Sequence, residues 1–255
     1  DSLILYIELS PAEVRAVQRR LAAGELRRIT RGVVTRLPES EWAALVARER
    51  IRLLAALFPQ AVIGPRTALS GGGPTPEGVI HLTYTYTRRV SLPGLTVQLV
   101  SGPKPASGDM PMMGRELYFP SPARMLLENL TISRGRVAKS AGKAAVEQRL
   151  IEICDARGED ALGTLRDDAR ALAPALGLGR EFELLDGLIG GVLGTRKHAM
   201  STPAGKAMAA DIPYDAQRLA LFEKLAQQLR SVPLKQPGAV TNTERSRTNF
   251  AFLES

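Results

Sequence analysis

The sequence predicts an α+β protein in three parts: an N-terminal winged-helix remnant, a small α/β domain and a C-terminal helical region. Three observations lead to this class. A capped helix is followed at once by a short basic hairpin, segments of β character occupy the middle of the chain, and helix-length apolar patterns separated by glycine or proline fill the second half. The chain of 255 residues is long enough for a sizeable core and for more than one compact unit.

The first helix is predicted from the stretch Ser10-Pro11-Ala12-Glu13. Serine at the N-cap, proline at the first helical position and glutamate three residues after the cap form a capping box. Apolar residues then recur at three- and four-residue spacing up to Leu21, and Gly24 follows as a helix-ending glycine would. We therefore expect an amphipathic helix that ends just before Gly24.

A basic hairpin follows this helix. Residues 26–29 and 33–35 have the composition of short strands, and Thr30-Arg31-Gly32 supplies the turn. A helix followed directly by a hairpin is the second half of a winged helix-turn-helix, in which the helix enters the major groove and the hairpin lies along the phosphates. Only nine residues precede Ser10, too few for the two earlier helices, so the module is expected to be a remnant.

Positive charge is concentrated in this segment. Residues 15–36 hold seven arginines against one glutamate, a net charge of +6, whereas the whole chain carries +8. Such a concentration at one end predicts contact with DNA. Two alternatives remain open: an ordinary solvated surface, and a docking surface for an acidic protein. The predicted DNA-binding residues are Arg15, Arg19, Arg20, Arg27, Arg28, Arg31 and Arg36.

The middle of the chain alternates helix and strand signals. An amphipathic helix is expected over residues 41–58, and Pro59 is expected to end it. A further helix is expected to start at Ser121-Pro122 and to run to Leu130. Between them four segments have strand character. These are residues 61–63, 79–87, 95–100 and 116–119.

From Gly142 onward the patterns are those of helices of ordinary length. They are expected over residues 143–156, 159–172, 180–193 and 216–229. A polar segment rich in serine, glycine and basic residues makes 131–142 the expected boundary, and the polar C-terminal tail is expected to be extended. The predicted division is therefore 1–38, 39–130, a linker at 131–142, a helical region at 143–232 and a tail at 233–255.

Residues 143–196 are net acidic, at −3, and contain more leucines than a solvent-facing helical pair would use. We expect most of these leucines to pack internally. One face is expected to contribute to a contact with a partner or a catalytic domain. It consists of Leu185, Leu188, Ile189 and Val192.

A catalytic or metal site is not predicted. The two histidines, His81 and His198, have no acidic neighbour at ligand spacing, and the single cysteine, Cys154, excludes an intrachain disulfide and the usual zinc sites. The glycine-rich loop at 70–78 lacks the lysine–serine pair of a phosphate loop. We expect no cofactor and no enzymatic activity of this chain. No export signal or apolar span is evident, so we expect a cytoplasmic protein without a membrane segment.

Two stretches resemble a known family. Residues 21–34, LAAGELRRITRGVV, and residues 59–69, PQAVIGPRTAL, resemble the N-terminal part of the abortive-infection (AbiE-type) type IV antitoxins, and 119–128, FPSPARMLLE, resembles the family's strand-to-helix segment. The resemblance implies a winged helix before an α/β antitoxin domain. It also implies binding to operator DNA, autoregulation of transcription and a partner toxin.

The second half resembles a different family. Residues 169–196 and 248–255 resemble the regulatory region ahead of the catalytic core in Fic-family proteins, whose HPFxxGNGR motif does not occur in this sequence. The expected function is thus DNA-linked regulation of the antitoxin type. The alternatives are the regulatory region of a Fic adenylyltransferase, which transfers AMP to a protein hydroxyl, and a protein-docking module. The operator, the toxin and the oligomeric state stay open.

Overall fold

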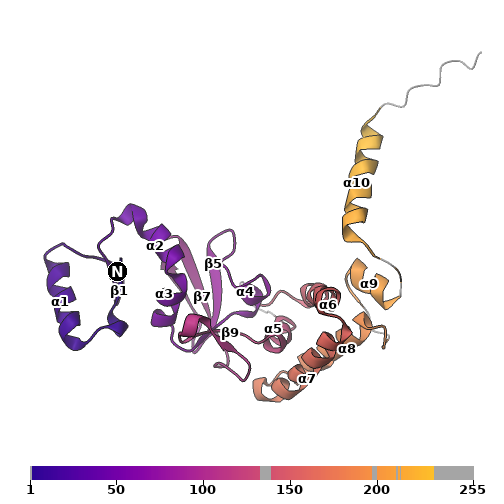
Figure 1. Ribbon diagram of the computed structural model, residues 1–255, viewed down its shortest axis with the longest axis horizontal. Helices are drawn as coiled ribbons and strands as arrows, with labels where there is room; N and C mark the ends of the chain where they lie inside the picture. The colour runs from indigo at the N-terminus through magenta and orange to yellow at the C-terminus, as the bar shows by residue number, and fades with distance from the viewer. Residues whose placement is uncertain (1, 133–138, 197–199, 211, 213, 233–255) are drawn as a thin grey trace, which may run out of the picture. The chain divides into compact units, whose positions relative to one another are not determined.

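The computed structural model describes residues 2–132, 139–196, 200–210, 212 and 214–232. The chain divides into two compact units, residues 1–213 and 214–255. The predicted class is confirmed as a mixed α+β fold. A small N-terminal sheet with helices is followed by a central six-stranded mixed sheet and a helical region (Figure 1).

The N-terminal helix and hairpin form as predicted. The Ser10 hydroxyl accepts a hydrogen bond from the Glu13 backbone N–H at 3.4 Å, and the Glu13 carboxylate accepts one from the Ser10 N–H at 2.7 Å, which confirms the capping box. Residues before Ser10 add a third strand, so the sheet has the order β1-β3-β2. The elements are β1 (Leu3–Leu5), the 3-10 turn η1 (Tyr6–Glu8), α1 (Pro11–Ala22), β2 (Arg27–Thr30) and β3 (Val33–Thr35).

The two faces of this small sheet pack in different directions. Val34 on one face forms a local cluster with Val17 of α1. Leu3, Leu5 and Val33, each 1% exposed, join the large core of the unit from the other face. Because successive side chains of a strand point to opposite faces, one short sheet connects α1 to the rest of the unit.

The central sheet is mixed and has the order β6-β7-β5-β4-β9-β8. β5 and β7 are parallel, as are β4 and β9, whereas β4 and β5 are antiparallel. The predicted strands are confirmed with small changes of length. The strands are β4 (Ala61–Ile63), β5 (Val79–Tyr84), β6 (Arg88–Leu92), β7 (Leu95–Ser101), β8 (Met110–Pro111) and β9 (Leu117–Phe119).

Several features of this region differ from the prediction, among them the strand β8, which was not predicted. The single helix expected over 41–58 is broken at Glu49, whose φ of −91° and ψ of 13° leave the helical region, and α2 (Trp42–Arg48) and α3 (Arg50–Leu57) result. The strand β6 was not predicted, because its position at the sheet edge leaves both of its arginines exposed and weakens the apolar alternation. The short helix α4 (Pro65–Leu69) was not predicted either.

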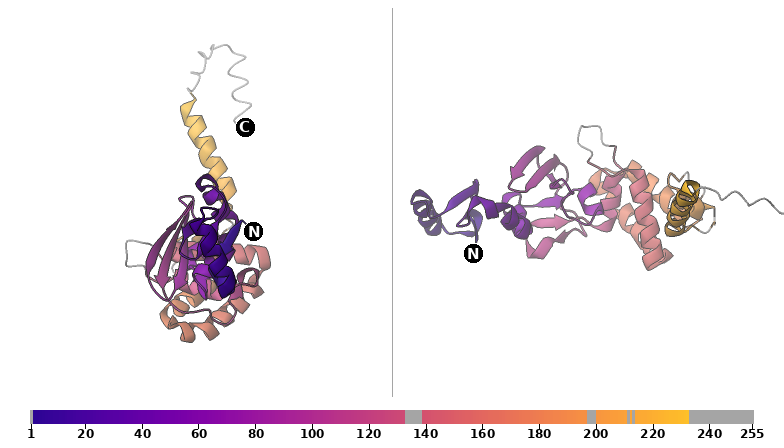
Figure 2. Two further views of the ribbon diagram at one scale, coloured as in Figure 1. Left: turned by 90° about the vertical axis from the view of Figure 1, so that its left-hand side faces the viewer. Right: turned by 90° about the horizontal axis from the view of Figure 1, so that it is seen from above.

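The helical region packs on the central part of the unit. A single apolar core extends from Leu3 to Ala204, and α5 contacts α6, α7 and α8. Figures 1 and 2 show the small sheet and α1 at one end of this unit and α6–α8 at the other, with the central sheet between them. The elements are α5 (Pro122–Asn129), α6 (Lys143–Arg157), α7 (Glu159–Leu176), α8 (Gly179–Val192) and α9 (Pro203–Ala209), of which only α9 was not predicted.

The segment predicted as a linker, 131–142, has its two ends close together. The Ser140 hydroxyl donates to the Thr131 carbonyl at 2.7 Å, and the Ala141 N–H donates to the Asn129 side-chain oxygen at 2.8 Å. Residues 133–138 of this segment and the tail at 233–255 lie outside the described residues.

The second unit contains α10 (Ala216–Ser231), the last of the predicted helices. Asp215 caps it by accepting a hydrogen bond from the Arg218 N–H at 2.9 Å. Its large apolar side chains are exposed, with Leu221 at 69% and Phe222 at 61%.

Candidate nucleic-acid interface

The predicted DNA-binding arginines lie on α1, on the β2–β3 hairpin and directly after it. The structure leaves six of the seven exposed. We call these six the arginine surface: Arg15, Arg19, Arg27, Arg28, Arg31 and Arg36. The seventh, Arg20, is half-buried and donates to the carboxylate of Glu25 at 3.0 Å, so the only acid within this stretch is already engaged.

Among the residues that the structure describes, no member of the arginine surface has an ion-pair partner. The carboxylates of the nearby residues Glu13 and Glu8 accept hydrogen bonds from groups outside the arginine surface. The Glu13 carboxylate accepts from Ser10, and this hydrogen bonding lowers its pKa. Glu8 accepts from Arg52 and Arg115, and the hydrogen bond from Arg52 is the main cause of its lowered pKa. The charge of the arginine surface is therefore left for solvent or for an external anion.

On α1, Arg15 and Arg19 are one helical turn apart and share an exposed stripe with Ala12 and Ala22. Gln18 is exposed beside them. Gln18 was not among the predicted residues, because it carries no charge. Arginine and glutamine side chains are those that form bidentate hydrogen bonds with guanine and adenine edges.

On the hairpin, Arg27 lies opposite Thr35 and Arg28 lies opposite Val34. Adjacent strand residues project from opposite faces, so these two arginines diverge. Arg28 and Arg31 instead converge, since both line an open hollow of about 560 Å³ between the hairpin turn, η1 and the end of α3.

The predicted partner face on α8 requires a correction. Leu185, Leu188 and Ile189 are each 0% exposed and Val192 is 5% exposed, and all four belong to the core of the unit. Contacts of α8 with α7, α5 and α9 cover them. Internal packing accounts for this face, and it offers no surface to a partner.

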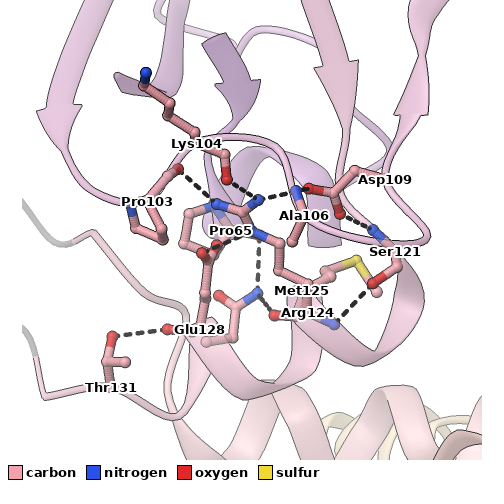
Figure 3. Close-up of polar contacts among 11 residues, drawn as sticks. Pro65, Pro103, Lys104, Ala106, Asp109, Ser121, Arg124, Met125, Glu128 and Thr131 are labelled. Atoms are coloured by element: carbon pink, nitrogen blue, oxygen red, sulfur yellow. Dashed lines mark hydrogen bonds and ion pairs between the residues drawn. The ribbon is translucent and has the colours of Figure 1, made fainter. Parts of the chain in front are cut away.

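A second polar site, not predicted from the sequence, surrounds Arg124 on α5 (Figure 3). Arg124 is 0% exposed and donates from Nε to Glu128 at 2.9 Å and from Nη1 to Asp109. It also donates to the carbonyl oxygens of Pro103 and Lys104, each at 3.0 Å. One guanidinium thus fixes the loop after β7 onto α5. The only sequence signal was the four-residue spacing of Arg124 and Glu128, which is common on helix surfaces.

Metal-binding groups and membrane-spanning helices were not expected from the sequence. Within the described ranges, no three His, Cys, Asp or Glu side chains are grouped so that they could hold a metal ion, and no helix there is long and apolar enough to cross a bilayer. His81 is buried in β5, where burial and then Arg66 lower its pKa. His198 lies outside the described residues.

Comparison of the chain with protein-family models, with curated proteins and with solved structures finds no match.

Proposed function

We propose that this protein is a DNA-linked regulatory protein that binds duplex DNA through the arginine surface. The observation that carries the proposal is that six exposed arginines on one helix and one hairpin have no acidic partner among the described residues. Each guanidinium that neutralises a phosphate releases a counterion condensed on the DNA, and this release favours binding. An ordinary solvated surface intersperses both signs of charge.

The order of elements supports a winged-helix remnant as the binding module. A strand precedes α1, the hairpin follows it, and the sheet order β1-β3-β2 places β3 between the other two strands. In this proposal α1 presents Arg15, Gln18 and Arg19 to the major groove, and the hairpin contacts the backbone. The regulatory role, of the autoregulatory antitoxin type, rests on the resemblance of residues 21–34 and 59–69 to AbiE-type antitoxins.

The test is the salt dependence of binding to a fluorescently labelled duplex, followed by anisotropy over a series of KCl concentrations. If Arg27, Arg28, Arg31 and Arg36 each neutralise one phosphate, the slope of log K against log salt is about −3.6, at about −0.9 for each phosphate. Replacing Arg28 and Arg31 by alanine should weaken binding to all sequences alike and reduce the slope by about 1.8.

The matched control is the double variant R88A/R89A, which removes the same charge from an exposed edge strand of the central sheet. It should bind as the wild type does. Polyglutamate serves as a competitor: if it displaces the duplex at equal charge concentration, the surface recognises acidic polypeptides and the DNA proposal fails. Absence of DNA binding at low ionic strength would also overturn it.

A further inference from the structure

The helix α10 carries a wide apolar face that is open to solvent. Its large apolar side chains, and that of the residue after it, are each between 47% and 69% exposed. These residues are Leu219, Leu221, Phe222, Leu225, Leu229 and Val232. A helix of 16 residues without packing partners is only marginally stable in water, so α10 gains stability from any apolar surface that covers this face.

Four of these residues form a continuous row, which we call the α10 seam. It consists of Phe222, Leu225, Leu229 and Val232, which follow one another at three- and four-residue spacing. This average spacing of 3.5 residues is that of two helices that pack side by side along their length. Leu219 and Leu221 flank the seam, one on each side, and widen the apolar face.

The charged residues of α10 lie away from the seam. Beyond the first turn they are Glu223, Lys224 and Arg230. Ala226 and Gln228, which border the seam, are uncharged, and the exposed Arg218 lies at its N-terminal end, one turn before Phe222. Residues that border such a seam select the partner by opposite charge or exclude it by like charge. An identical helix therefore approaches this seam without like-charge repulsion.

The described part of the first unit presents no comparable apolar face. Its large core is formed without any residue of α10. Its exposed large apolar side chains belong to separate segments, and no helix or strand presents a row of them. They are Ile7, Tyr86, Met110, Met113, Ile132 and Ile212. A second α10 is thus the matching surface among the described residues.

We propose that α10 packs along its seam against the α10 of a second copy of this chain, which makes the protein a dimer. Such an interface is formed by the same residues of both copies, as in most homodimers. A lipid surface matches α10 less well, because membrane-surface helices have a polar face rich in lysine and arginine, whereas Glu223, Gln227 and Gln228 share the polar face here. The proposal does not rest on DNA binding, since α10 contains no residue of the arginine surface.

The experiment is sedimentation equilibrium of the full chain, without DNA, over a series of protein concentrations. We expect the wild type to have twice the mass of one chain. The variant L225A/L229A removes two side chains of the seam and preserves the helix, because alanine is the best helix former. Its dissociation constant should rise at least tenfold, since both copies lose buried apolar surface.

The matched control is E223A/R230A, which places two alanines on the polar side of the same helix without changing the net charge. It should dimerise as the wild type does. A wild type that stays monomeric at every concentration would overturn the proposal, and so would a dimer whose dissociation constant is the same in L225A/L229A. Flotation with vesicles of phosphatidylglycerol and phosphatidylcholine tests the other occupant: if a monomeric wild type binds the vesicles and L225A/L229A does not, the face belongs to a lipid surface and the dimer proposal fails.

Discussion

Arg124 and its neighbours illustrate at the residue scale how a buried charge is satisfied. Asp109 accepts from the N–H groups of Ala106 and Ser121, each at 2.8 Å, in addition to its ion pair with Arg124. Among the described residues Glu128 has a hydrogen bond only from Arg124, and it is therefore the weakly stabilised member of the triad. Burial raises its pKa, Arg124 lowers it, and the nearby charge of Asp109 raises it further.

This raised pKa leads to a prediction of pH-dependent stability. The folded state binds the proton of Glu128 more tightly than the unfolded state, whose pKa is near 4.5, so protonation stabilises the fold. The stabilisation is fully present below that value and is lost as the pH rises through the raised folded pKa. We expect the wild type to lose stability relative to the variant E128Q as the pH rises from below 4.5 to neutrality.

Urea denaturation of both proteins across that range measures the difference in free energy of unfolding. The variant E152Q, which changes an exposed glutamate on α6, is measured in the same way as the control. A difference between wild type and E128Q that stays constant with pH, or that changes in the opposite direction, would contradict the assignment.

At the scale of elements, α8 is held by apolar packing together with the ion pairs of one aspartate. It contacts α7, α5 and α9, and Asp186 on it pairs with Arg166 of α7 at 2.9 Å and with Arg196. We expect Ile189→Asp to destabilise the protein by about 3–5 kcal/mol, because it places an unpaired charge at a position with 0% exposure.

Thermal and urea unfolding measure this loss. Glu183→Ala, an exposed substitution on the same helix, is the control and should change stability by less than about 0.5 kcal/mol. If I189D instead retained the wild-type melting temperature, the face would not be core. Sedimentation of I189D would then show whether this face of α8 mediates association between chains.

On the scale of the whole molecule, stability is expected to reside in the first unit. Among the residues that the structure describes, the large apolar core runs from Leu3 to Ala204 and includes none from α10. Removing residues 214–255 should therefore leave the cooperative unfolding transition and its midpoint nearly unchanged, as measured by circular dichroism. A truncated chain that unfolds without cooperativity would show that the second unit contributes to the core.

The sequence by itself determined the features that depend only on residues close together in the chain. The capping box of Ser10 and Glu13, the turn at Gly32 with its φ of +77° and the N-cap of Ser121 involve residues at most a few positions apart. Most helices were predicted for the same reason, since apolar periodicity is a local property. The arginine surface was also evident, because charge density is read directly from the residues.

Only the tertiary structure decided which side chains lose water. The buried face of α8 depends on contacts with α5, which is distant in sequence. The strand β6 forms because β7 offers a pairing edge, and its own apolar pattern is weak. A pocket of about 180 Å³ that Glu128 lines is assembled from β5, β7, α5 and the end of α7, so no local pattern could indicate it. An arginine and a glutamate four residues apart look alike on an exposed helix and in a core, and burial, which arises only from packing, distinguishes the two.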